Sequence, residues 1–145
     1  MALIGGGGAG NVAGGNPSGT GTGLTYVGDH CYAYSGGIGS SVLSSIGTML
    51  SFDTGSSYIL GNLIVTGSTN TAGASPTGGI DSFYLKINGE LVMAIKSETN
   101  TENSPTNYTV PILLPPQSSI LVEGISNTGN DAWVLTASIS GRVYG

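Results

Sequence analysis

Charged residues are scarce in this 145-residue sequence. Only 8% of the residues are Asp, Glu, Lys or Arg, compared with roughly 25% in an average soluble protein. Ion pairs therefore cannot be the main source of stability, and Ser, Thr, Asn and backbone groups must cover most of the surface. The length suits one domain with a self-sufficient hydrophobic core.

Basic residues are rarer still. The fixed cations are Lys86, Lys96 and Arg142, and the formal net charge is -5. Because phosphate contacts need a basic surface, we expect neither nucleic acid nor an anionic membrane as a partner. The first residues lack the basic start of a secretory signal, and no apolar run nears the roughly 20 residues that span a bilayer. We therefore expect synthesis in a cytoplasm.

The residues that usually carry chemistry are also few. Cys31 is the only cysteine, which excludes an intrachain disulfide and a thiolate cluster, and His30 is the only histidine. In a strand, His30 would point away from both Asp29 and Cys31, so we expect Cys31 to be a buried small hydrophobe. The acidic residues are scattered, mostly at predicted turns. We expect no enzyme, no cofactor and no metal site. Calcium binding by the oxygen-rich loops 98–103 and 127–131 stays open as the weaker alternative to solvated loops.

Glycine, by contrast, is abundant, with 26 residues concentrated early in the chain. Residues 1–23 have no periodicity and little to bury, and they form a predicted N-terminal arm. The arm is either a flexible leader or a segment that orders against a neighbouring subunit, with Leu3 and Ile4 as its natural anchor. The predicted domain spans residues 24–145.

From residue 24 onward, short runs rich in β-branched and aromatic residues alternate with Gly, Asn, Ser and Pro clusters. This pattern predicts a single antiparallel β-sandwich of about eight strands. We expect strands near residues 24–35, 47–53, 57–67, 81–87, 90–97, 107–114, 118–126 and 131–144. The segment 38–50 could instead contain a short turn of helix.

Asn88-Gly89 is the strongest local signal, because this dipeptide favours a β-hairpin. A two-residue loop would put the apolar residues of the two strands on opposite faces. A three-residue loop with Gly89 in a bulge instead sets Leu85 opposite Leu91 on the core face, and we prefer it.

Two further strands carry positional information. Pro111 would interrupt a central ladder, so its strand is predicted at an edge or a bulge, before a loop stiffened by Pro115 and Pro116. In the last strand, alternation predicts a core-facing set. Its members are Trp133, Leu135, Ala137, Ile139 and Val143.

Four short stretches are similar to those of a known family. They are Leu3-Ile4-Gly5-Gly6-Gly7-Gly8, Tyr32-Ala33-Tyr34-Ser35-Gly36, Leu50-Ser51-Phe52-Asp53-Thr54-Gly55 and Ile139-Ser140-Gly141-Arg142-Val143-Tyr144. In their order and spacing, the chain resembles short virion proteins of tailed phages, especially marine ones. The resemblance implies a single jelly roll, similar to trimeric ones of the tumour-necrosis-factor type, displayed on a capsid or a fibre tip. It implies no catalytic residue.

The expected function is therefore that of a viral structural protein of the virion. We expect a capsid decoration, a cement protein or another surface component, which binds the major capsid protein or a fibre as a homotrimer. The candidate subunit contacts are Ile4, Tyr26, Tyr32, Tyr34 and Tyr144. If the first and last strands of a jelly roll pair, two of these tyrosines lie near residues 133–144. The alternative is a lectin-like module that binds a receptor or glycan through its Asn- and Thr-rich loops.

Overall fold

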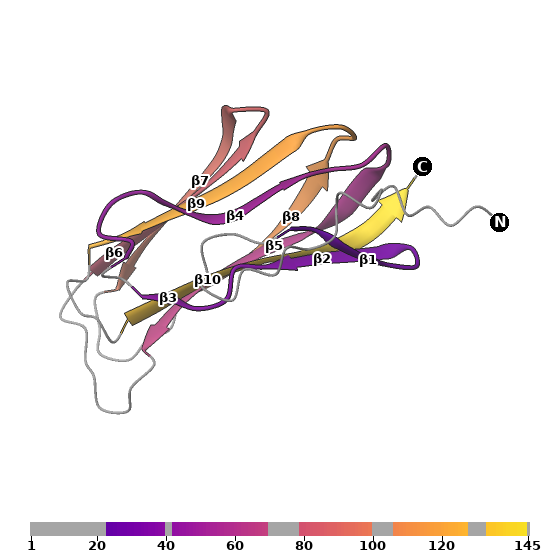
Figure 1. Ribbon diagram of the computed structural model, residues 1–145. Helices are drawn as coiled ribbons and strands as arrows, with labels where there is room; N and C mark the ends of the chain where they lie inside the picture. The colour runs from indigo at the N-terminus through magenta and orange to yellow at the C-terminus, as the bar shows by residue number, and fades with distance from the viewer. Residues whose placement is uncertain (1–22, 40–41, 70–78, 100–105, 128–132, 145) are drawn as a thin grey trace.

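The computed structural model describes residues 23–39, 42–69, 79–99, 106–127 and 133–144 (Figure 1). Within these ranges the chain forms ten strands and no helix. The strands are β1 (Thr25–Val27), β2 (His30–Tyr34), β3 (Ile38–Gly39), β4 (Gly47–Asp53), β5 (Tyr58–Thr69), β6 (Gly79–Ile87), β7 (Glu90–Thr99), β8 (Thr106–Leu114), β9 (Ser119–Ser126) and β10 (Trp133–Tyr144). The prediction of an all-β chain is confirmed.

The strands form two antiparallel sheets, which Figure 1 shows as two layers. The six-stranded sheet has the order β1-β2-β10-β5-β8, with β3 also paired to β10, and the four-stranded sheet has the order β4-β9-β6-β7. After β3 the chain changes sheet at every connection except the β6–β7 hairpin. This is the connectivity of a jelly roll. β2, which lies within the predicted first strand, pairs with β10, so the expected position of Tyr32 and Tyr34 near residues 133–144 is confirmed.

The prediction of one strand over residues 24–35 is wrong. The segment is a hairpin of β1 and β2, in which Val27 pairs with His30 across the two-residue turn Gly28-Asp29. Gly28 has a φ of 62°, and a glycine with positive φ at the first turn position is typical of a type II′ hairpin. Alternation alone did not reveal this turn.

The β6–β7 hairpin is confirmed, but its predicted three-residue loop is wrong. Asn88 and Gly89 both have positive φ, 53° and 85°, and they form a two-residue loop of the type I′ kind. A β-bulge, in which Val92 is the extra residue of β7, brings the core-facing residues of β6 and β7 to the same side of the sheet. Leu85 consequently lies opposite Met93 instead of Leu91.

Two other local predictions concern the segment 38–50 and the strand that contains Pro111. In the described part of segment 38–50, β3 and β4 flank a turn in which the Val42 N–H donates to the carbonyl of Gly39, and no helix forms there. Pro111 lies in β8, the edge strand of its sheet, which confirms the predicted position.

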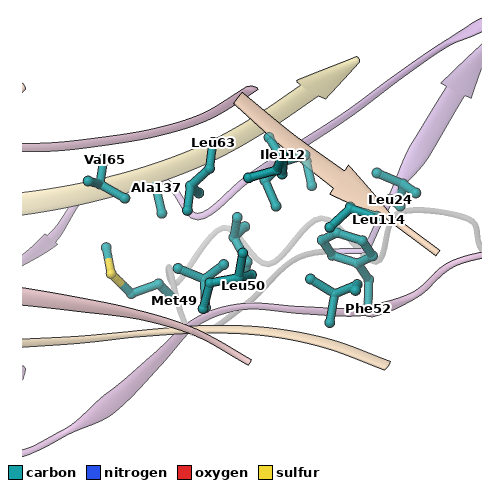
Figure 2. Packing of buried hydrophobic residues seen from close by; sticks show 14 of the residues in the cluster. Leu24, Met49, Leu50, Phe52, Leu63, Val65, Ile112, Leu114 and Ala137 are labelled. Carbon is teal, nitrogen blue, oxygen red and sulfur yellow. The ribbon is translucent and has the colours of Figure 1, made fainter. Parts of the chain in front are cut away.

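The core lies between the two sheets, and side chains from both layers point toward one another (Figure 2). Among the described residues, the largest fully buried side chain is that of Phe83, on β6. Of the set predicted for the last strand, four members are buried: Leu135, Ala137, Ile139 and Val143. The side chain of Trp133 lies outside the described residues. Because each fully buried large apolar side chain contributes roughly 1.5–3 kcal/mol, this core is the main source of stability.

A buried hydroxyl ties two connections together. The Thr54 Oγ1 donates to the carbonyl of Pro115 (2.7 Å) and accepts from the N–H of Ser118 (2.8 Å). The Thr54 N–H also donates to the Ser118 carbonyl (2.9 Å). The β4–β5 and β8–β9 connections are therefore held at the same end of the sandwich.

Candidate interaction surface

The outer side of the six-stranded sheet carries several exposed apolar and aromatic side chains. In a strand, alternate side chains point to opposite faces, and β5 buries Ile59 and Leu63 in the core. Its outward positions include Tyr58, Leu60 and Ile64, which are apolar or aromatic as well. A strand that is apolar on both faces is normally covered on both.

The strand register gathers outward residues of neighbouring strands into rows. Arg142 pairs with both His30 and Leu60, and Leu60 pairs with Leu113. In the next rows, Ser140 lies between Tyr32 and Asn62, and Ser138 lies between Tyr34 and Ile64. Tyr144 pairs with Tyr58 beside the first row.

Six large apolar or aromatic side chains on this side are 47–62% exposed. They are Val27, Tyr34, Tyr58, Leu60, Leu113 and Tyr144. We call the outer side of the six-stranded sheet, with these six residues, the aromatic face. Monomeric soluble proteins rarely expose large contiguous apolar patches, so the aromatic face is the candidate site.

Aromatic contacts organise part of this face. The rings of Tyr32 and Tyr34 stack with centroids 5.0 Å apart and planes inclined by 29°. The Arg142 guanidinium lies 5.9 Å from the ring centroid of Tyr144, within range of a cation–π interaction. Between them is a shallow hollow of about 490 Å³, whose lining includes Asn62 and Ser140.

The Asp29 carboxylate contacts both His30 and Arg142 on the aromatic face. Asp29 Oδ1 lies 2.7 Å from His30 Nδ1, and Asp29 Oδ2 accepts a hydrogen bond of 2.5 Å from Arg142 Nη2. This hydrogen bond to Arg142 holds the pKa of Asp29 below its ordinary value. The prediction that His30 lies apart from Asp29 is wrong, because Asp29 occupies the turn and not a strand.

Cys31 lies on the opposite side of the sheet from His30. Its side chain is buried in the core, as predicted, and burial raises its pKa to about 11. The thiol therefore stays neutral near pH 7. The only histidine of the sequence, His30, lies on the other side of the sheet and cannot act as its base. The pair offers no nucleophilic chemistry of the Cys–His kind.

Two glycines lie at the floor of the hollow. Gly61 of β5 pairs with Gly141 of β10, and both line the hollow. A Cβ atom on Gly61 would lie 2.2 Å from the Ser140 carbonyl oxygen, and one on Gly141 would lie 2.6 Å from the Leu60 carbonyl oxygen. The two central strands approach so closely that only glycine fits at this pair.

Charge is divided unequally between the two sheets. Among the described side chains, four of the five carboxylates and two of the three fixed cations belong to the four-stranded sheet. They are Asp53, Asp81, Glu90, Glu123, Lys86 and Lys96. Lys86 Nζ and Glu123 Oε2 form an ion pair of 2.6 Å there. Among the described residues, the aromatic face carries only the paired Asp29 and Arg142, together with His30.

The structure brings together three of the five predicted contact residues. Tyr32, Tyr34 and Tyr144 lie on the aromatic face, whereas Tyr26 packs against the core from the inner side. Ile4 lies outside the described residues, as does the arm 1–23 except Gly23. Most of the oxygen-rich loops lies outside them too.

The sequence reasoning missed Tyr58, Leu60 and Leu113. The signal that could have found the first two was the segment 58–65, in which both alternating sets are largely apolar. Such a pattern marks a strand covered on two sides.

Comparison with known proteins assigns this chain to no family. No family model matches the chain, and no curated protein matches it either. Within the described ranges, no three His, Cys, Asp or Glu side chains gather as possible metal ligands. A search of the same ranges for a helix that is long and apolar enough to cross a membrane finds none.

Proposed function

We propose that this protein is a viral structural protein, a capsid decoration or cement protein or another virion surface component, that acts by binding neighbouring virion subunits. The aromatic face is the observation that carries the proposal. It combines exposed aromatic and leucine side chains with hydroxyl and amide groups, and it contains no unpaired carboxylate among the described residues. Such a surface has a low desolvation cost when it is covered by protein.

The resemblance to phage virion proteins supplies the viral part of the proposal, and the jelly-roll connectivity agrees with it. In this proposal the protein is made in the host cytoplasm and joins the virion as a homotrimer, through the major capsid protein or a fibre. It acts by binding alone, without a catalytic step, a cofactor, nucleic acid or a membrane.

Mass spectrometry of purified virions of the phage that encodes the chain tests this proposal. We expect the protein among the virion components at a stoichiometry that fits a repeated surface site. Its absence from intact, purified virions would refute the proposal. A chain lacking residues 1–23 serves as a second test: loss of virion attachment with retained folding assigns the attachment to the arm, whereas retained attachment assigns it to the jelly roll.

A lectin-like role is the second candidate, and the hollow in the aromatic face favours it. Stacked Tyr32 and Tyr34 could lie against a sugar ring, and Asn62 could hydrogen-bond to hydroxyl groups beside them. Screening of the protein against a glycan array separates the two roles. Binding that disappears in Tyr34→Ala and Asn62→Ala, while Tyr84→Ala on the four-stranded sheet retains it, would favour the lectin. No binding to any glycan would exclude it.

A further inference from the structure

The aromatic face needs an occupant, and its polar groups indicate which kind. Apart from the Asp29–Arg142 pair and His30, they are hydroxyls and amides, such as those of Ser140 and Asn62. Each hydroxyl or amide can both donate and accept a hydrogen bond. A surface of this kind can pair with another copy of itself, which a surface of donors alone or acceptors alone cannot do.

The distribution of charge points the same way. The formal net charge of -5 makes copies of this chain repel one another in general. Because the carboxylates of the described strands lie on the four-stranded sheet, two copies that meet by their aromatic faces hold these carboxylates apart. Asp29 adds no uncompensated charge to such a contact, since Arg142 pairs with it within the same copy.

The size of the face is also sufficient. The six strands of the sheet contain 43 residues, and each residue covers about 16 Å² of the sheet, because it rises about 3.3 Å along its strand and neighbouring strands lie about 4.8 Å apart. These dimensions give about 700 Å², close to the roughly 800 Å² that each partner contributes to a stable interface. Tyrosine and arginine, which dominate binding energy in interfaces, both occur within it.

We infer that the partner covering the aromatic face is a second copy of this chain. The inference rests on the proposed function and deepens it by naming the partner and the surface. Leu60 and Leu113, which pair directly across β5 and β8, lie within the contact, and the stacked Tyr32 and Tyr34 lie on the same face on the other side of β10.

The test compares two leucines of nearly equal exposure. Leu60, on the aromatic face, is 54% exposed, and Leu91, on β7 of the four-stranded sheet, is 55% exposed. Light scattering coupled to size exclusion, over a series of concentrations, measures the mass of the unmodified chain, Leu60→Asp and Leu91→Asp. We expect an oligomer for the unmodified chain, with a mass that is a whole multiple of 14.4 kDa and at least twice that value. Because Leu60→Asp buries an unpaired carboxylate in the contact, it should weaken assembly at least about 100-fold, and Leu91→Asp should leave it unchanged.

A monomeric unmodified chain overturns the inference, as does an oligomer that Leu60→Asp leaves intact or that both variants weaken equally. Circular dichroism checks that each variant folds. If Leu60→Asp fails to fold, Leu60→Ser removes the apolar contact without adding a charge, and its assembly should weaken about tenfold or more. A folded Leu60→Ser that assembles like the unmodified chain also overturns it.

The inference and the proposed function fail separately. A monomer that is still found in purified virions contradicts the inference and the proposed homotrimer, and it leaves the proposed role in the virion standing. An oligomer that depends on Leu60 but is absent from virions contradicts the proposed function alone.

Discussion

Replacement of Gly61 by alanine should destabilise the protein strongly, although alanine normally suits a strand better than glycine. The new Cβ would lie 2.2 Å from the Ser140 carbonyl oxygen and 2.7 Å from the Gly141 Cα. These are backbone atoms, so β5 and β10 must separate to admit it. Overpacking of this kind costs about 1–3 kcal/mol, and each disturbed ladder hydrogen bond adds about 1 kcal/mol. The lower entropy of the unfolded chain offsets about 0.4–1 kcal/mol.

We therefore expect Gly61→Ala to lower the free energy of unfolding by about 3 kcal/mol, which for a chain of this size lowers the melting temperature by about 6–12 °C. Gly124→Ala is the matched control, because its Cβ would meet mainly the Met49 side chain, at 2.5 Å from Sδ. A methionine can change rotamer, so the control should lose less stability. Calorimetry of both variants measures the difference. If Gly61→Ala is as stable as Gly124→Ala, the close approach of the two strands is not the constraint inferred above.

Two further predictions concern buried polar groups. Alkylation of Cys31 at pH 8 should be at least about 100-fold slower in the folded protein than in urea, because burial raises the pKa of the thiol from 9.0 to about 11 and also blocks access of the reagent. Mass spectrometry of iodoacetamide-treated samples measures the two rates. Equal rates would contradict the buried position of Cys31. Thr54→Val should lower the free energy of unfolding by about 2 kcal/mol in urea titrations, because the N–H of Ser118 and the carbonyl of Pro115 lose their partner. Thr109→Val, at an exposed position of β8, is the control, and an equal loss there would refute the reasoning.

Much of the architecture could be predicted from the sequence, because alternation of apolar and polar residues reports directly on burial in strands. The last strand shows this, with its core-facing side chains from Leu135 to Val143 buried as expected. Two local features could not be predicted in this way. The turn at Gly28 depends on a positive φ inside an apparently continuous strand, and the bulge at Val92 inserts one residue that resets the faces of a hairpin. Both are changes in backbone conformation, which the pattern of hydrophobic residues does not indicate.

The candidate surface was predictable only in part. Tyr32 and Tyr34 follow from strand alternation, together with the pairing of first and last strands that the jelly roll implies. Leu113 comes to the same surface only because β8 pairs with β5, and pairing between distant strands cannot be inferred from local pattern. The contact between Asp29 and His30 was excluded on the assumption of a strand, and it exists because the chain turns at that residue.

The pair of Gly61 and Gly141 connects the stability of the sandwich to the composition of its surface. A shift of β5 by one residue would turn Leu60 toward the core and Gly61 toward solvent, because side chains alternate with a period of two. It would also place a residue with a Cβ atom opposite Gly141, where the present separation of the strands leaves no room for one. The close approach of the two glycines therefore selects one register. That register fixes which apolar side chains are exposed, so the aromatic face is a consequence of how the centre of the sheet packs.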